Sequence, residues 1–145
     1  MSNYQGFHDT TEGKEAIDKA RSIIAGAYGS VNFYEHRYIA GIIYTDGVRE
    51  IAEALSCHWL IDIVVSHQVK DEVCAESFQE WRLEKDSGHG HDVIATDGGK
   101  GSGFITIATQ KLESGSDFPE ALMPFKMWLV RDGGTRQVLM LPGEY

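Results

Sequence analysis

Residues 57–68 read CHWLIDIVVSHQ. Within this stretch, one aspartate, Asp62, stands in a run from Trp59 to Val65 that is otherwise apolar. The run decides the fold because it predicts the central helix. A helix with this sequence carries apolar side chains on all sides, which is typical of a central helix covered by other elements. An ionised carboxylate inside a core costs several kcal/mol unless a partner compensates for it. We therefore expect Asp62 to be buried in a satisfied network, with His58, a tyrosine hydroxyl or an arginine such as Arg37 as its donor.

His58 and Ser66 stand four residues before and after Asp62, so the three side chains form one polar ladder on the predicted helix. Serine, histidine and aspartate together suggest a nucleophilic triad. A triad serine normally lies on a strained turn beside an oxyanion hole, whereas a serine within a helix tends to bond its own backbone. The ladder therefore favours the structural role. The alternative is an acid–base pocket in which Asp62 and His58 converge with His36 and Asp46.

Two helices are predicted in the first half of the chain. The first covers residues 10–28, where apolar residues recur at helical spacing. The second begins at Thr45 or Asp46, either of which offers an N-cap. We expect this second helix, from Val48 to His67 with a bend near Ser56, to lie at the centre of the fold.

From Phe78 onwards the apolar residues alternate, which indicates strands. In FQEWRLEKD, which starts at Phe78, Gln79, Trp81 and Leu83 share one face and charged residues share the other. The further predicted strands are HDVIAT (91–96), GFITIATQKL (103–112) and the hairpin FKMWLVRDGGTRQVLMLP (125–142). Helices first and strands after predict a single α+β domain, residues 1–145, in which N-terminal helices pack on a C-terminal antiparallel meander sheet.

The first strand of that hairpin is apolar on both faces, since Phe125, Met127 and Leu129 alternate with Trp128 and Val130. Two covered faces indicate either a central strand or a sheet face buried by a second copy of the chain. A homo-oligomer therefore stays open as an alternative.

The charge of the chain is biased, because its 145 residues carry a net charge of −9 at pH 7. A field of this sign opposes binding to phosphate backbones and anionic membranes and favours basic partners. We expect no direct contact with nucleic acid or membranes. The segment from Asp71 to Asp97 holds eight acidic residues against Arg82 and Lys85. If it folds onto one face it presents an acidic surface, with partner-binding residues Asp71, Glu72, Glu76, Glu80, Glu84 and Asp86.

The compartment follows from the cysteines and from the start of the chain. Two cysteines, Cys57 and Cys74, form neither a disulfide framework nor a CxxC pair. The opening MSNYQGFHD lacks the basic and apolar regions of a signal peptide, and no apolar stretch is long enough to span a membrane. We expect a cytoplasmic protein with both thiols reduced and buried.

The segment DGGKGSG (97–103) invites comparison with a phosphate-binding loop. That motif needs Ser or Thr directly after its lysine and a helix after the loop. Here Gly101 follows Lys100 and a strand is predicted next, so we interpret the segment as a flexible hairpin connection.

The segment HGHD (89–92) places two histidines where they share one face of a strand and could join a metal site. A metal needs three or four ligands, and no HExxH, CxxC or aligned carboxylate pair completes the set. We interpret the segment as a solvated loop and expect no metal.

Several runs together resemble an uncharacterised bacterial and phage family known only as a domain of unknown function. They are YTDGVREIAEAL from Tyr44, then WLIDIVVSHQ, FQEWRL, DFP and VLMLPGEY. Tyr34-Glu35-His36 is similar to the Tyr-x-His element of that family, with Arg37 where the family pattern has tryptophan.

The resemblance covers Tyr34 to Tyr145 and leaves out the first helix and the glycine-rich segment. Because that family has no established activity, the resemblance implies no reaction. It implies that Asp62 and the segment Tyr44–Gly47 belong to a shared pattern, and that carriage on phages and plasmids fits the chain.

The leading hypothesis is a non-catalytic acidic binding protein. On a mobile element, such a protein would act as an inhibitor that occupies a basic, nucleic-acid-binding surface of host immune machinery. The alternative is a small hydrolase or transferase with a His/Asp acid–base pocket, whose catalytic residues would be His36, Asp46, His58 and Asp62. The lack of a complete catalytic set favours the binding protein, and neither hypothesis requires a cofactor.

Overall fold

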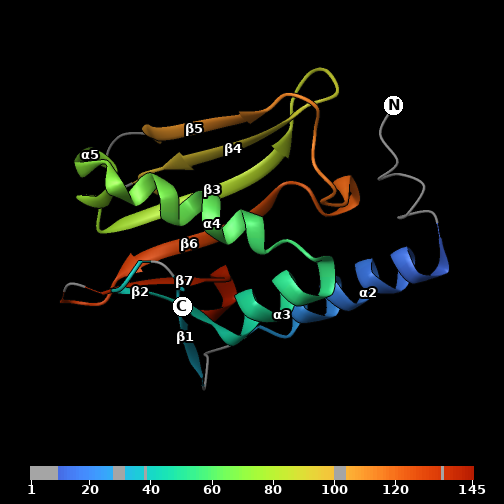
Figure 1. Ribbon diagram of the computed structural model, residues 1–145, viewed down its shortest axis with the longest axis horizontal. Helices are drawn as coiled ribbons and strands as arrows, with labels where there is room; N and C mark the ends of the chain where they lie inside the picture. Colours follow the sequence, from blue (N-terminus) through green and yellow to red (C-terminus); the bar gives the residue numbers. More distant parts are fainter. Residues whose placement is uncertain (1–9, 28–31, 38, 100–103, 135) are drawn as a thin grey trace.

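The structure is a computed structural model that describes residues 10–27, 32–37, 39–99, 104–134 and 136–145. A helix, two short strands and then consecutive helices make up its first half, and strands dominate the second (Figure 1). The helices are α2 (Thr11–Ala25), α3 (Asp46–Leu55), α4 (His58–Ser66) and α5 (Asp71–Cys74), with short 3-10 helices η1 (His67–Val69), η2 (Glu120–Leu122) and η3 (Pro142–Glu144). The strands are β1 (Phe33–Glu35), β2 (Ile42–Thr45), β3 (Phe78–Lys85), β4 (His91–Thr96), β5 (Thr106–Leu112), β6 (Phe125–Arg131) and β7 (Gln137–Met140).

The strands form one seven-stranded sheet in the order β1-β2-β7-β6-β3-β4-β5, which confirms the α+β class. Every pairing is antiparallel except that of β2 with β7. Strands β3, β4 and β5 form the predicted meander, but β6 returns to the free side of β3. The predicted arrangement is therefore only partly right, because the sheet also contains β1 and β2, which lie between α2 and α3 in the sequence.

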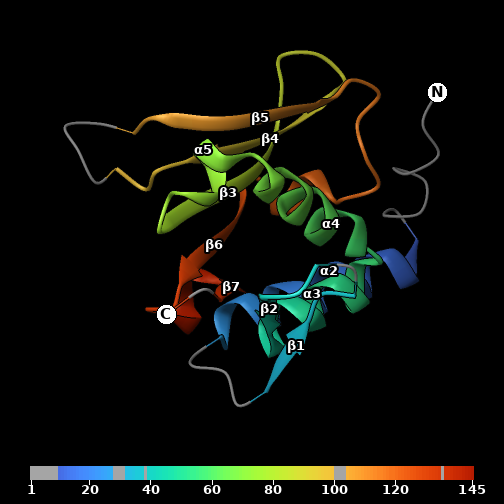
Figure 2. The same cartoon turned by 60° about the vertical axis from the view of Figure 1, so that its left-hand side comes forward.

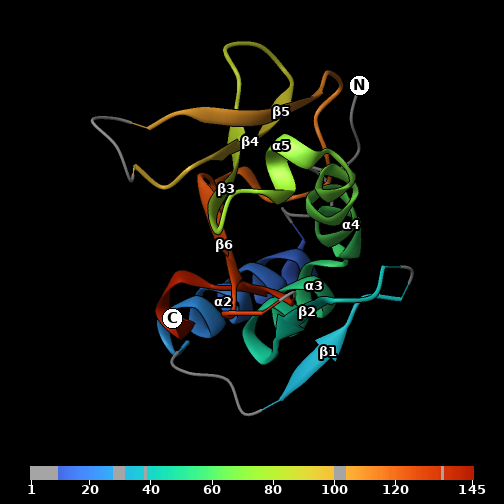
Figure 3. The ribbon, with the colours of Figure 1, turned by 90° about the vertical axis from the view of Figure 1, so that its left-hand side faces the viewer.

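The main core lies between the sheet and the helices. Helices α3 and α4 bury Val48, Ile51 and Val64 against Trp81 and Leu129 of the sheet. Figure 2 shows α2 running beside α3, and Figure 3 shows α4 to one side of β3 and β6. Alternation along β3 explains this arrangement, since Gln79, Trp81 and Leu83 face the helices, whereas Glu80, Arg82 and Glu84 face away.

The predicted central helix is two helices. Ser56 adopts a left-handed conformation (φ 53°), and the Cys57 N–H then donates to the Ala52 carbonyl to close the end of α3. The bend expected at Ser56 is thus a break. The cap predicted for the first of these helices is confirmed, because the Thr45 side chain accepts from the Val48 N–H.

The expectation that Asp62 is buried was wrong. Its side chain is 63% exposed and contacts His36, whose Nε2 lies 2.8 Å from Asp62 Oδ1. His58 and Ser66 are exposed as well, so the polar ladder is the solvent-facing stripe of α4. The half-buried Trp59 and Ile63 flank that stripe. Because they are apolar, the polar stripe is narrow and the helix sequence suggests burial on all sides.

The β6–β7 hairpin was predicted correctly, and β6 is a central strand between β7 and β3. Its second apolar face meets a small cluster on the helix-free side of the sheet, where Ile43, Val138 and Met140 are buried beside Trp128. The aromatic rings of Phe78 and Tyr145 lie 5.1 Å and 5.6 Å from that of Trp128. Intramolecular packing therefore accounts for the pattern along β6.

The two glycine-containing motifs also have structural outcomes. The segment from Asp97 connects β4 to β5, as predicted, although its residues 100–103 lie outside the described residues. In the other motif His89 is exposed, but His91 begins β4 with a side chain only 3% exposed. The solvated-loop interpretation was therefore wrong for His91.

Candidate functional site

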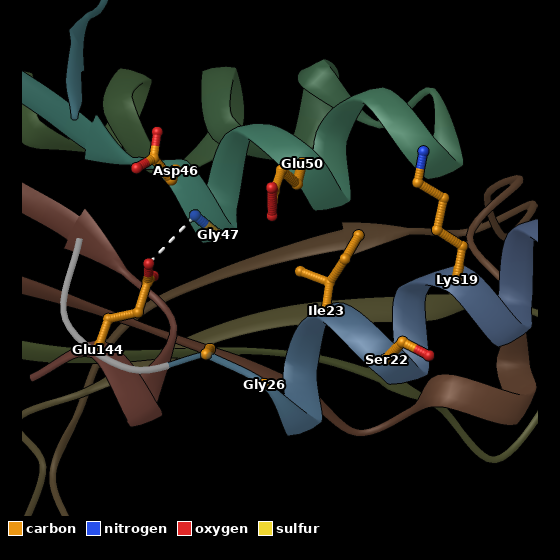
Figure 4. Close-up of a pocket in the computed structure, with 9 residues that line it drawn as sticks. Lys19, Ser22, Ile23, Gly26, Asp46, Gly47, Glu50 and Glu144 are labelled. Carbon is orange, nitrogen blue, oxygen red and sulfur yellow. Dashed lines mark hydrogen bonds between the residues drawn. The ribbon is translucent and has the colours of Figure 1, made fainter. Parts of the chain in front are cut away.

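A cavity of about 370 Å³ opens between α2 and the first turn of α3 (Figure 4). Small residues of α2 and its C-terminal end, Ser22 and Gly26, form one wall, and Gly47 and Glu50 form the other. Glu144, which comes from η3 at the far end of the sequence, completes the lining. The site thus combines three segments that are distant in the chain.

Glu144 holds this site together. The residue is 9% exposed, and its carboxylate accepts three hydrogen bonds: from Thr45 Oγ1 (2.5 Å), from the Gly47 N–H (3.1 Å) and from the Leu141 N–H (2.9 Å). The Gly47 N–H belongs to the first turn of α3, where a carboxylate is favoured by the free N–H groups and the helix dipole. The carboxylate therefore caps α3 and fixes the end of the chain against it.

Two glycines permit this close approach. A Cβ atom on Gly47 would lie 2.7 Å from Glu144 Oε1, and one on Gly143 would lie 2.4 Å from the Ala27 carbonyl oxygen. Both distances are shorter than real Cβ contacts allow. Glycine at these positions lets η3 dock against α3 on one side and the end of α2 on the other.

The charged residues in the described lining of the cavity are mostly acidic, with Asp46, Glu50 and Glu144 against one base, Lys19. Figure 4 shows Glu50 directed toward α2, whereas the Asp46 carboxylate points away from it. Asp46 is positioned by the Tyr34 hydroxyl (2.9 Å) and by the Asn32 N–H (3.0 Å). Its charge and that of Glu144 are thus held in place by protein donors.

Glu50 is exposed at the rim of the cavity. The neighbouring base, Arg49, pairs with Glu53 instead (3.3 Å) and stacks over the Tyr34 ring at 4.4 Å. Glu50 is therefore available to a ligand at the mouth. The arrangement suits a cationic group, which Glu50 would attract at the mouth and Lys19 would partly oppose.

The four residues predicted for an acid–base pocket are distributed over two places. His36 and Asp62 form a contact on the surface of α4, whereas Asp46 binds Tyr34 and lines the cavity. His58 is exposed on α4. The described lining of the cavity contains Asp46 alone of the four, so it does not provide a histidine as general base.

The predicted partner-binding acids lie on different elements. Asp71 and Glu72 are exposed on α5, Glu76 follows that helix, and Glu80 and Glu84 lie on the helix-free face of β3. The sixth, Asp86, stabilises the β3–β4 turn by accepting from the Gly88 (2.7 Å) and Gly90 (3.1 Å) N–H groups. These acids therefore flank both sides of the sheet.

Sequence reasoning missed a buried histidine, His91, and the two side chains that it contacts. His91 Nδ1 lies 2.8 Å from Ser116 Oγ and its Nε2 lies 2.8 Å from Glu120 Oε2. This contact lowers the pKa of the Glu120 carboxyl, chiefly through the hydrogen bond with His91. The cluster fastens the segment after β5 to the start of β4. Within the described residues, no group of three or more histidine, cysteine or acidic side chains is arranged to hold a metal ion.

Glu144 was not among the candidate residues identified from the sequence. The signal that points to it is the resemblance motif at the end of the chain, Leu141 to Tyr145, which contains both Gly143 and Glu144. The structure brings this motif against Thr45 and Gly47 of the other motif, across about a hundred residues of sequence.

The fold and the site define an α+β domain with a cavity formed where the segment Tyr44–Gly47 meets the motif Leu141 to Tyr145. The chain belongs to a family of unknown function, DUF6876, whose model matches residues 18–145. The match includes most of α2, which extends the relationship beyond the segment from Tyr34 that the motifs indicated. Neither the curated proteins nor the solved structures gave a match to this chain. Every helix in the described ranges is too short or too polar to cross a membrane.

Proposed function

We propose that this protein is a non-catalytic acidic binding protein, and that its cavity between α2 and α3 accepts a lysine or arginine side chain of a basic protein partner. The observation that carries the proposal is the lining of the cavity, in which Asp46, Glu50 and Glu144 outnumber Lys19. A volume of about 370 Å³ accommodates one long side chain with its charged group. The burial of Glu144 strengthens its attraction for a cation that enters.

The remaining acids support this proposal through the long-range field. Of the six acids predicted to bind a partner, Asp86 accepts only from backbone N–H groups, and Asp71, Glu72, Glu80 and Glu84 form no ion pair with another described residue. Because they flank both sides of the sheet, we assign to them the steering of a basic partner rather than one common contact. Association of this kind is fast at low salt and weakens as ionic strength rises.

The class of partner follows from the charge. A nucleic-acid-binding surface is basic and presents arginine and lysine side chains, so it matches both the cavity and the net charge of −9. Our proposal therefore includes an inhibitor, encoded by a phage or plasmid, that occupies such a surface on host immune machinery.

The test uses a defined probe, N-acetyl-arginine amide, titrated into the isotopically labelled protein and followed by amide chemical shifts. We expect saturable shifts at Gly26, Gly47 and Glu50, with no shifts from the neutral probe N-acetyl-glutamine amide. Glu50→Lys should weaken binding by about tenfold, because an attraction becomes a repulsion at the mouth.

Glu15→Lys is the matched control, since Glu15 is exposed on α2 but outside the described lining of the cavity. It changes the net charge equally and should leave the affinity nearly unchanged. Equal loss in both variants, or shifts that avoid the cavity, would contradict the proposal.

A further inference from the structure

A second cavity, of about 180 Å³, lies where helices α4 and α5 end beside the β6–β7 hairpin. Its described lining includes Gln68 and Cys74 from the helical side, and Arg131 and Gln137 from the hairpin. It shares no described lining residue with the cavity between α2 and α3. Arg131 is the one charged residue in this described lining, so the second cavity favours an anion, in contrast to the first.

Arg131 and Gln137 line the same small space. They stand directly opposite each other in the β6–β7 pairing, where opposite side chains lie on one face of the sheet with Cβ atoms about 5 Å apart. The Arg131 guanidinium is held in place, because its Nη2 donates to the Cys74 carbonyl and lies 3.5 Å from Cys74 Sγ. The backbone N–H of Gln137 donates to the Gly41 carbonyl at 2.8 Å, which fixes the start of β7. A positive charge and an amide are therefore positioned side by side before any ligand arrives.

The hydrogen bonds of the neighbouring amide determine which atom Gln137 leaves for a ligand. Gln68 Nε2 donates to the Val64 carbonyl at 3.0 Å, so the other polar atom of that amide, Oε1, faces Gln137. This oxygen can only accept, and Gln137 Nε2 donates to it at 3.2 Å. No described residue donates in turn to Gln137 Oε1, although Gln137 is only 4% exposed and lines the cavity. A buried acceptor without a donor is unfavourable, and a donor that enters the cavity would satisfy it.

These two groups specify the ligand. A guanidinium binds a carboxylate through parallel hydrogen bonds, and Gln137 Oε1 requires a donor close to that carboxylate. An ammonium donor would be repelled by Arg131, so a hydroxyl is the matching group. At about 30 Å³ for each water-sized group, the cavity accommodates about six non-hydrogen atoms. We propose that this cavity binds a small 2-hydroxy carboxylate, with its carboxylate on Arg131 and its hydroxyl donating to Gln137 Oε1.

This binding site goes beyond the proposed function and does not rest on it. The two cavities differ in the charge of their described linings and take ligands of opposite sign, so either can fail alone. The net charge of −9 opposes the approach of an anion at long range. Salt screens that field beyond about 8 Å at physiological ionic strength, whereas the contact with Arg131 acts at hydrogen-bond distance.

The test compares three probes of nearly equal size: lactate, propionate and lactamide. Each is titrated into the isotopically labelled full chain at constant ionic strength and followed by amide chemical shifts, with sodium chloride as the blank. We expect lactate to give saturable shifts at Gly41 and at the side-chain amide of Gln137. Propionate lacks the hydroxyl and should bind about fivefold more weakly, because one hydrogen bond is lost. Lactamide lacks the charge and should bind about twentyfold more weakly.

Arg131→Gln should weaken lactate binding by about twentyfold as well, because it removes the positive charge. Arg136→Gln is the matched control, since Arg136 lies on the same hairpin outside the described lining and pairs with Asp132 at 2.9 Å. It changes the net charge equally and should alter the affinity by less than about twofold. If Arg131→Gln loses the dispersed spectrum of a folded protein, the three probes on the unsubstituted chain decide.

Three results would overturn the proposal. The first is an affinity for lactate that equals that for propionate or lactamide. The second is an equal effect of the two variants in the folded state. The third is a set of shifts no larger than those from sodium chloride, which would indicate an adventitious ion only.

Discussion

Replacement of Glu144 by glutamine tests the contact that holds η3 against Thr45 and Gly47 at the start of α3. The carboxylate accepts from Thr45 Oγ1, the Gly47 N–H and the Leu141 N–H. A glutamine side chain has the same shape but presents an NH2 group in place of one oxygen. At least one of the three protein donors must then face another donor, at a residue that is only 9% exposed.

The loss of one hydrogen bond to a charged group, with its donor left buried, costs about 2 kcal/mol of unfolding free energy. For a chain of this size, we expect the melting temperature to fall by about 6 °C. Urea denaturation followed by tryptophan fluorescence measures the change, and the slope against urea should stay as in the unsubstituted protein.

Glu113→Gln provides the matched control, because Glu113 is exposed in the segment after β5. It should change the unfolding free energy by less than about 0.5 kcal/mol. If Glu144→Gln were as mild as this control, Glu144 would not be the link between η3 and α3, and the reasoning about the cavity would be refuted.

Two further predictions concern titratable groups. The pKa of Glu120 lies below its ordinary value of 4.5 because of the hydrogen bond with His91, so His91→Ala should raise it, as measured by the carboxyl carbon shift. A lowered pKa stabilises the fold above pH 4.5, and this stabilisation is lost as the pH falls through the folded-state value. Burial raises the pKa of the Cys57 thiol to about 12, so alkylation of the folded protein at pH 8 should label the half-buried Cys74 and leave Cys57 unmodified until the chain unfolds. Because the unfolded chain loses that proton near 9.0, stability should also decline as the pH rises above 9.

Local patterns predicted the elements whose partners lie nearby in the sequence. Alternation identified β3, and two strand-forming runs around Asp132-Gly133-Gly134 identified the β6–β7 hairpin. Strand β2 was missed because it has only four residues and its partner β7 lies far along the chain. Such a strand depends on long-range pairing, which a local pattern does not contain.

The error at Asp62 has a different cause. Counting apolar residues along α4 predicted a covered helix, but helical spacing also places His58, Asp62 and Ser66 on one narrow stripe. That stripe faces solvent, and His36 pairs with Asp62 there at 2.8 Å. The sequence contained the signal, and the cost of burying a charge should have favoured the exposed arrangement.

The cavity between α2 and α3 was out of reach of local patterns for a related reason. Asp46 was recognised as a candidate, but Glu144 joins it only through the fold, by way of Thr45 and Gly47. The resemblance motifs include both Tyr44–Gly47 and the segment Leu141 to Tyr145, but the contact between these two segments is a property of the tertiary structure.

The claim on which the function depends is that a carboxylate-lined hollow between two helices receives a cationic side chain. An intermolecular Overhauser experiment on the complex with N-acetyl-arginine amide examines it most directly. We predict cross-peaks from the arginine methylene protons to the methyl groups of Ile23, which lines the hollow. Cross-peaks to Trp128 and Tyr145 alone, on the helix-free face of the sheet, would contradict the account.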